Sequence, residues 1–384
     1  MSGRSREGHG PKYYLLSLAL LSWGGGIFPG RAQGLPAADS GKIAAPASPF
    51  IFGAYAQGAL ITDHASAASH LAAAHPTGLE LNVQRQTTGA APWHRWYRYP
   101  KAGLALVYYD YHHPTLGRSY AASVYLSKAL VRTARHDLSF RLGTGLAYFT
   151  QHYDPHTNRE NTFIGAPLNA TLQMRLEYDV ALSQHLGLLL ALALNHYSNG
   201  GTAYPNFGLN LPTLLVGVNY HQARPALRAF APGPLPADVG HYFINLSTSL
   251  GYRQRDGDPN HYLVNSVALA AGRRLNRKSN VLLGLEGFYD RLLLADRRAS
   301  ASGSGPLPDV KKASAFAGHE LLFGRLALVT HLGLYFYSPY KSSPAYYERV
   351  GLKYQLTNLL FGAIDLKAYG GVAEVVEFKA GVKL

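Results

Sequence analysis

Cysteine is absent from the 384 residues, and methionine occurs only twice. The absence of cysteine excludes disulfides, thiolate metal sites and cysteine nucleophiles. Long apolar runs are absent as well. The N-terminal run Tyr13–Leu21 is far shorter than the ~20 residues that a membrane-spanning helix needs, and no later segment reaches that length. Any crossing of a membrane must therefore be made by strands.

Acidic residues are scarce, with 22 Asp and Glu against 36 Lys and Arg, which gives a formal net charge of +14. Such a balance favours an acidic partner: nucleic acid, anionic lipid or a phosphorylated glycolipid. The basic residues are scattered and form no nucleic-acid-binding motif, so no nucleic-acid partner is expected. A solvated basic surface is the alternative reading of the charge.

The N-terminus has the features of a secretory signal. Arg4, Arg6 and Lys12 precede the apolar run, and small residues around Ala32 suit cleavage. We therefore expect a signal peptide at residues 1–33. The Ala-, Pro- and Ser-rich residues 34–49 then form a flexible leader, and the mature protein is exported.

From about residue 50 to residue 384, apolar and polar residues alternate in segments of roughly ten residues. Charged residues recur in the middle of the polar face of these segments, and tyrosines gather at segment ends, as at membrane interfaces. A soluble sandwich also alternates, so one segment decides nothing. Strands in a bilayer must close into a barrel. The pattern predicts an all-β fold, a transmembrane antiparallel β-barrel over residues 50–384, with about sixteen strands and fourteen as the alternative.

Connection lengths predict an orientation for this barrel. Short connections are expected to be periplasmic turns, and long polar ones to be outer loops, including a mobile Ser- and Gly-rich piece at 299–309. The short connections are 183–185, 324–325 and 356–358, and the long ones are 150–166, 198–211 and 292–311. The long segments 87–102 and 222–240 do not fit, because they fall on the periplasmic side. Capping or lining the barrel is the role expected of them.

The stretch Leu188–Asn210, LLLALALNHYSNGGTAYPNFGLN, carries the chemistry. Side chains of a strand alternate between faces, so the leucines at 188, 190, 192 and 194 share one face with His196 and Ser198. A serine beside a base becomes a nucleophile, and its anionic intermediate needs preorganised donors. The following loop offers backbone N–H groups at its glycines and the amides of Asn199 and Asn206. Polar residues at a membrane interface are the alternative reading of the pair.

The stretch HYSNGGTAYPNFGLN resembles the H-x-S-N-x-G…P-N-x-G signature of the lipid A 3-O-deacylase and acyloxyacyl hydrolase-like outer-membrane family. Further stretches are similar to the longer members of that family, and the resemblance covers about residues 50–220. These stretches are TTGAAPWHRWYRYPKAG (87–103), HHPTLGRSYA (112–121), RLGTGLAY (141–148) and IGAPLNA (164–170).

The resemblance implies a serine ester hydrolase that removes an acyl chain from lipid A at the exterior of the barrel. By position, Ser198 matches the nucleophile and His196 the general base. Asn206 and the backbone N–H of Gly201 match the oxyanion donors. The implied partner is lipid A or another acylated glycolipid of the outer leaflet of a Gram-negative outer membrane.

The chain departs from the family pattern at one position. The characterised deacylases carry a Glu four residues after the Asn of P-N, and this chain has Asn210 there. An amide can orient His196 by accepting its N–H, but it cannot stabilise the imidazolium by charge. Glu160 and Asp154, in a neighbouring outer loop, are candidates for a replacement acid.

The sequence thus predicts an outer-membrane serine esterase that needs no cofactor, with a catalytic set of Ser198, His196 and Asn210. The adjacent His112 and His113 lack a third ligand at a suitable spacing, so no metal site is expected. Two alternatives from other classes remain open, a passive channel and a structural barrel with an altered site. The oligomeric state stays open too.

Overall fold

The computed structural model describes residues 49–62, 70–225, 227, 234–300, 309–340 and 344–384. The expected signal peptide at 1–33, nearly all of the leader at 34–49 and most of the loop at 299–309 lie outside these ranges. Within them, no helix is long and apolar enough to cross a membrane.

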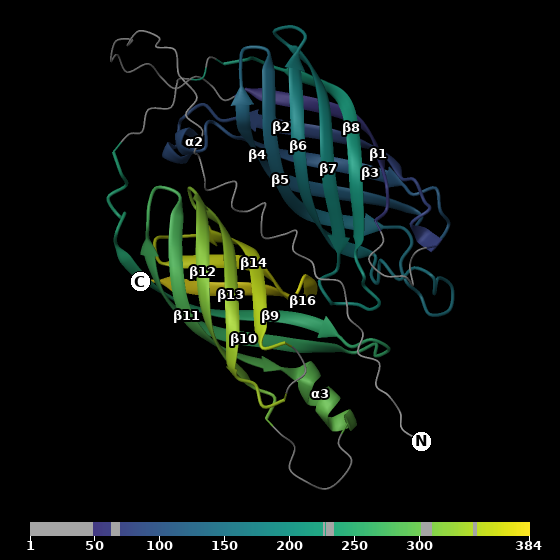
Figure 1. Ribbon diagram of the computed structural model, residues 1–384, viewed down its shortest axis with the longest axis vertical. Coiled ribbons are helices and arrows are strands. Elements are labelled where there is room, and N and C mark those ends of the chain that lie inside the picture. The colour runs from purple at the N-terminus through teal and green to yellow at the C-terminus, as the bar shows by residue number, and fades with distance from the viewer. Residues whose placement is uncertain (1–48, 63–69, 226, 228–233, 301–308, 341–343) are drawn as a thin grey trace.

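The described chain forms two closed antiparallel β-barrels of eight strands each (Figure 1). The expectation of an all-β antiparallel barrel is confirmed. The first barrel contains β1 (Phe50–Ala59), β2 (Thr77–Gln86), β3 (Lys101–Asp110), β4 (Arg118–Arg132), β5 (His136–Phe149), β6 (Leu168–Ala181), β7 (Leu186–Ser198) and β8 (Leu209–His221). The second contains β9 (Tyr242–Gln254), β10 (His261–Arg274), β11 (Ser279–Asp290), β12 (Lys312–Phe323), β13 (Leu326–Tyr337), β14 (Tyr346–Gln355), β15 (Leu360–Tyr369) and β16 (Val372–Lys383). Two short helices, α2 (Pro92–Trp96) and α3 (Arg291–Ser300), lie in connections.

The described residues form sixteen strands, as expected, but these strands close as two rings instead of one. Strand β8 pairs with β1, with Tyr55 opposite Gly217, and β16 pairs with β9, with Phe378 opposite Leu250. Apolar and polar residues alternate in the same way in a ring of eight and in a ring of sixteen. The pattern along single strands therefore predicted the number of strands. It did not predict which strands pair to close a ring.

The two long connections that did not fit a single barrel both serve the pair of barrels. Residues 222–241 lead from β8 to β9 and so join the two rings. Helix α2, between β2 and β3, packs against the turn that joins β12 and β13 of the second barrel. The Tyr97 ring centroid lies 4.5 Å from that of Phe323, and the Trp93 ring meets the same phenylalanine edge-on at 6.4 Å.

We call the end of the barrels with the short connections 182–185, 324–325 and 356–359 the turn end. The opposite end, with residues 150–167 and 199–208, is the loop end. Helix α2 and the inter-barrel connection lie at the turn end, because each follows an even-numbered strand of an up-and-down barrel. The candidate active loop lies at the loop end.

A cluster of ion pairs lies inside the first barrel. Glu80 Oε1 lies 3.0 Å from a guanidinium nitrogen of both Arg141 and Arg175, and Glu177 lies 3.5 Å from Arg141. All four side chains are buried. An eight-stranded barrel is just wide enough for its side chains to fill. Here the ion pairs share the packed interior with a cluster of buried apolar side chains that includes Tyr111, Phe149 and Tyr197.

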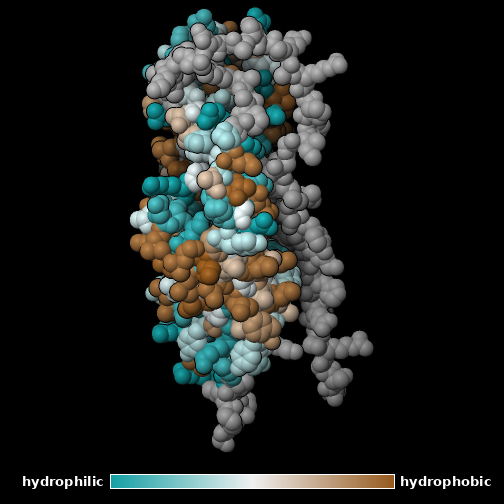
Figure 2. Space-filling view, turned by 90° about the vertical axis from the view of Figure 1, so that its left-hand side faces the viewer, coloured by the Kyte–Doolittle hydropathy of each residue, from teal (hydrophilic) through white to brown (hydrophobic). Residues whose placement is uncertain are grey.

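The outer faces of both barrels are apolar. Figure 2 shows hydrophobic side chains gathered on the lower part of the visible face, which belongs to the second barrel, with hydrophilic ones above and below. An apolar band with polar margins is typical of a transmembrane barrel. Exposed outward residues include Leu79, Leu81, Val124, Leu192, Leu283, Leu285, Leu334 and Phe378.

We predict that Glu80→Gln lowers the free energy of unfolding by about 3 kcal/mol, because it leaves Arg141 and Arg175 buried without their shared carboxylate. Urea unfolding of the refolded protein in detergent measures the change. Glu348→Gln, on an exposed position of β14, is the matched control. An unchanged midpoint for Glu80→Gln would contradict a stabilising role for the cluster.

Candidate active site

The last residues of β7 place His196 and Ser198 on the outer face of the first barrel. Leu192, on the same face, is 61% exposed, whereas Tyr197, on the opposite face, is 0% exposed. His196 and Ser198 are half-buried. The side chains therefore alternate as the sequence predicted, and the pair lies where the apolar wall meets the loop end.

Asn210 lies directly opposite His196. Strands β7 and β8 pair in a register that makes these two residues cross-strand partners. Asn210 Oδ1 lies 2.7 Å from His196 Nδ1. With this oxygen as acceptor, Nδ1 carries the proton, and Nε2 is the basic nitrogen of the ring. The backbone carbonyl of Asn210 also accepts the N–H of Thr62 at 3.1 Å, which anchors this end of β8.

Asn206 directs its amide at the hydroxyl of Ser198. Its Nδ2 donates to Ser198 Oγ at 2.9 Å. Its Oδ1 accepts the backbone N–H of Asn199 at 3.3 Å, which fixes the orientation of the amide. A donor held at this position is suited to a negative charge that develops on an oxygen beside Ser198.

Asn199 folds the loop between Ser198 and Asn206. Its buried Oδ1 accepts the N–H groups of Gly201, Thr202 and Ala203 at 3.0, 3.1 and 3.3 Å. The Asn199 amide is thus engaged within the loop. The N–H of Gly201, the expected oxyanion donor, is engaged here as well, whereas the N–H of Gly200 points at Ser198 Oγ, 3.2 Å away.

Gly208 makes room for the imidazole. Its φ is +75°, and a Cβ at this position would lie 2.8 Å from His196 Cε1. No side chain fits there without displacing the histidine ring. The preceding residue, Phe207, is 49% exposed on the same loop.

The two alternative acids both lie in the connection between β5 and β6. Asp154 Oδ1 accepts the backbone N–H groups of His156 and Thr157 at 2.8 Å each, and these bonds, that of His156 first, hold the pKa of Asp154 below its ordinary value. Glu160 is exposed in the same β5–β6 connection. Asn210 is the residue that the structure brings to His196.

The adjacent histidines His112 and His113 each form a hydrogen bond with a nearby threonine. His112 Nε2 lies 2.7 Å from Thr77 Oγ1, and His113 Nδ1 accepts the N–H of Thr115 at 3.3 Å. Among the described residues, no group of three or more His, Asp or Glu side chains is placed to hold a metal ion.

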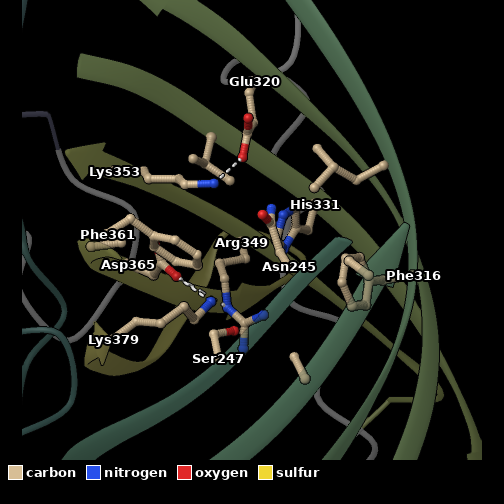
Figure 3. A pocket seen from close by; sticks show the side chains of 15 residues that line it. Asn245, Ser247, Phe316, Glu320, His331, Arg349, Lys353, Phe361, Asp365 and Lys379 are labelled. Carbon is tan, nitrogen blue, oxygen red and sulfur yellow. Dashed lines mark hydrogen bonds and ion pairs between the residues drawn. The ribbon is translucent and has the colours of Figure 1, made fainter. Parts of the chain in front are cut away.

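The interior of the second barrel holds a small cavity lined by both charged and apolar side chains (Figure 3). Its volume is about 30 Å³, which accommodates about one water molecule. Figure 3 shows Lys353 directed at Glu320 and Lys379 directed at Asp365, and the first pair is 2.9 Å apart. These ion pairs occupy the lumen, so the cavity has no room for an acylated glycolipid.

The sequence of each barrel matches the model of a known protein family. Residues 77–219 match the family model of the lipid A 3-O-deacylase (PagL), and residues 241–384 match that of the acyloxyacyl hydrolase C-terminal domain. The chain belongs to the lipid A 3-O-deacylase family. The two matches coincide with the two barrels. Membership makes the chain a β-barrel of the Gram-negative outer membrane, in a family of lipid A hydrolases.

No curated protein matches the sequence. Among solved structures, Neisserial surface protein A is 12% identical, with a TM-score of 0.31 over 44% of this chain and 96% of that one. CdiB from Acinetobacter baumannii is 11% identical, with a TM-score of 0.20 over 87% and 60%. The P. putida toluene transporter TodX is 9% identical, with a TM-score of 0.18 over 88% of both chains.

We predict that Gly208→Ala lowers the release of fatty acid from lipid A at least tenfold, because the added methyl group displaces His196 from Asn210. Gly257→Ala, which also has a positive φ but open space around it, is the matched control for backbone strain. Equal activity in the two variants would show that the space beside His196 is unimportant.

Proposed function

We propose that this chain is a serine esterase that hydrolyses an acyl ester of lipid A or a related glycolipid at the lipid-facing side of the first barrel. The observation that carries the proposal is one arrangement at the loop end. Asn210 Oδ1 bonds His196, Asn206 Nδ2 bonds Ser198, and His196 and Ser198 follow the exposed leucines of β7 on one face.

In this proposal Ser198 Oγ attacks the ester carbonyl while His196 Nε2 takes its proton. The tetrahedral intermediate carries its negative charge on the former carbonyl oxygen, and Asn206 Nδ2 donates to that oxygen. The ester C–O bond then breaks, and His196 gives the proton to the departing alkoxide oxygen, which leaves as a hydroxyl of the glycolipid. Water, activated by the same imidazole, then hydrolyses the acyl-enzyme and releases the fatty acid.

The backbone donor that assists Asn206 is assigned to the glycine pair of the loop. The family pattern points to Gly201, whose N–H donates to Asn199 Oδ1. The N–H of Gly200, directed at Ser198 Oγ, is better placed for an oxyanion. Asn210 holds the proton of His196 on Nδ1 and adds no charge, which favours a slower enzyme than one with a carboxylate at this position.

The passive channel is the less favoured alternative. Both barrels contain eight strands, and buried ion pairs occupy their interiors. A barrel of this size is filled by its own side chains, in contrast to wide porins. The filled lumens favour chemistry on the outer wall.

We predict that Ser198→Ala abolishes the release of fatty acid from lipid A in detergent, because the nucleophile is lost. The folded barrel, measured by its heat-dependent mobility in gels, should be unchanged. Ser247→Ala, which lines the cavity of the second barrel, is the matched control and should retain full activity. Unchanged release by Ser198→Ala would exclude the proposed mechanism.

We predict that Asn210→Glu raises the hydrolysis rate or leaves it unchanged, because a carboxylate there still accepts the Nδ1–H of His196 and also stabilises the imidazolium. Initial rates with lipid A measure the effect. Asn260→Glu, in the β9–β10 connection, controls for the added charge. Complete loss of activity in Asn210→Glu would argue against its pairing with His196.

A further inference from the structure

The loop from Asn199 to Asn206 is held by the second barrel as well as by the first. Gln254, the last residue of β9, makes two hydrogen bonds to it. The backbone N–H of Gln254 donates to the carbonyl oxygen of Gly201 at 3.0 Å, and its side-chain Oε1 accepts the N–H of Tyr204 at 2.9 Å. One residue of the second barrel thus fixes the loop at two points.

The backbone of Gly201 lies against the tip of β16. A Cβ on Gly201 would be 2.7 Å from the carbonyl oxygen of Glu374, and the φ of Gly201 is +85°. The Glu374 carboxylate is held in turn by Arg253 at 2.9 Å and by Lys367 at 3.0 Å. The surface that receives the loop is therefore a rigid, ion-paired part of the second barrel.

Tyr204 also lies beside these groups. Burial raises the pKa of its phenol, and the positive charge of Arg253 opposes that rise. The residues after Tyr204 return to the first barrel, where the N–H of Phe207 donates to Thr162 and that of Gly208 to Phe163, at 3.2 and 3.1 Å. Asn206 lies between these two sets of contacts, so its position depends on both barrels.

We propose that Gln254 is a positioning residue for the esterase, through which the second barrel holds the loop so that Asn206 points at Ser198. The inference rests on the proposed function, because it assigns Asn206 to the oxyanion. The inference gives the second barrel a role in the reaction at the first barrel, although the proposed catalytic side chains all come from the first barrel. Both hydrogen bonds of Gln254 to the loop are made with backbone groups of the loop.

The test removes the side-chain acceptor and keeps the length of the residue. We expect Gln254→Met to lower kcat for lipid A about tenfold with KM unchanged, because the lost bond to Tyr204 affects the oxyanion donor in the transition state. Gln254→Glu retains an acceptor oxygen and should keep kcat within about twofold of the parent. Gln355→Met, at the turn end of the second barrel, is the matched control and should be unchanged.

Gln254→Asn is a second loss variant, to be used if Gln254→Met does not fold, because its shorter side chain withdraws the acceptor by one carbon. Unchanged kcat in the folded loss variant would overturn the inference. An equal fall of kcat in Gln254→Met and Gln254→Glu would overturn the inference too, because such a fall would not depend on the acceptor oxygen. A change in KM alone would overturn it as well, because the inference concerns the transition state.

Ser198→Ala in the same series separates the two hypotheses. Loss of activity in Ser198→Ala together with normal kcat in Gln254→Met would leave the esterase standing and remove only the role of Gln254. Retained activity in Ser198→Ala would remove the esterase and the role of Gln254 with it. A fluorophosphonate that reacts with activated serines gives a second readout, because its rate of attachment to Ser198 should fall in Gln254→Met and recover in Gln254→Glu.

Discussion

Closure of each sheet after eight strands is the constraint on which the other features of this protein depend. Within a bilayer every backbone N–H and C=O must be paired inside the protein, and a closed ring of strands meets that requirement. A ring of eight leaves an interior that side chains fill, here with Glu80 between Arg141 and Arg175, and with Arg349 between Glu286 and Glu377. A large substrate is therefore excluded from the lumen, and the outer wall and the connecting loops remain for it.

The candidate site uses two properties of this wall. The alternation of side chains along β7 places His196 and Ser198 on the lipid side, and the register of β7 with β8 places Asn210 opposite His196. Neither property depends on a flexible segment. The loop that follows adds the amide of Asn206, whose orientation is set by its bond to the Asn199 N–H. The strands thus position the proposed nucleophile and base, and the loop positions the proposed oxyanion donor.

Much of the fold and of the candidate site could be predicted from the sequence, because strands and the faces of their side chains depend on the local alternation of residues. The period of two predicted the strands and the face on which His196 lies, and the P-N-x-G motif pointed to Asn206. The division into two barrels could not be predicted in this way, since it depends on pairing between β8 and β1, far apart in the chain. The contacts of Gln254, and so its proposed role, could not be predicted for the same reason, because its partners Gly201 and Tyr204 are distant in sequence. Gly208 belongs to the motif, but its closeness to the ring of His196 depends on how the loop folds back onto β7.

The two long connections that did not fit a single barrel, residues 87–102 and 222–240, are explained by the division into two barrels. A long Pro-rich connection at the turn end is unnecessary between neighbouring strands of one ring, and an aromatic helix there needs a surface to cover. Residues 222–241 and helix α2 satisfy both points, because one joins the barrels and the other packs on Phe323. With Gln254 at the loop end, the two barrels are thus in contact at both ends.

Under the proposed function, the outward direction of Ser198 also determines how the ester of the substrate reaches it. The exposed leucines that precede it on β7 and the exposed Phe207 of the adjoining loop place the hydroxyl at the boundary between hydrocarbon and headgroups. A glycolipid anchored in the same leaflet arrives there by lateral diffusion and need not leave the membrane. The concentration that such an enzyme experiences is the mole fraction of its substrate in the surface, and dilution of that substrate by other lipids slows the reaction even when the total amount is unchanged.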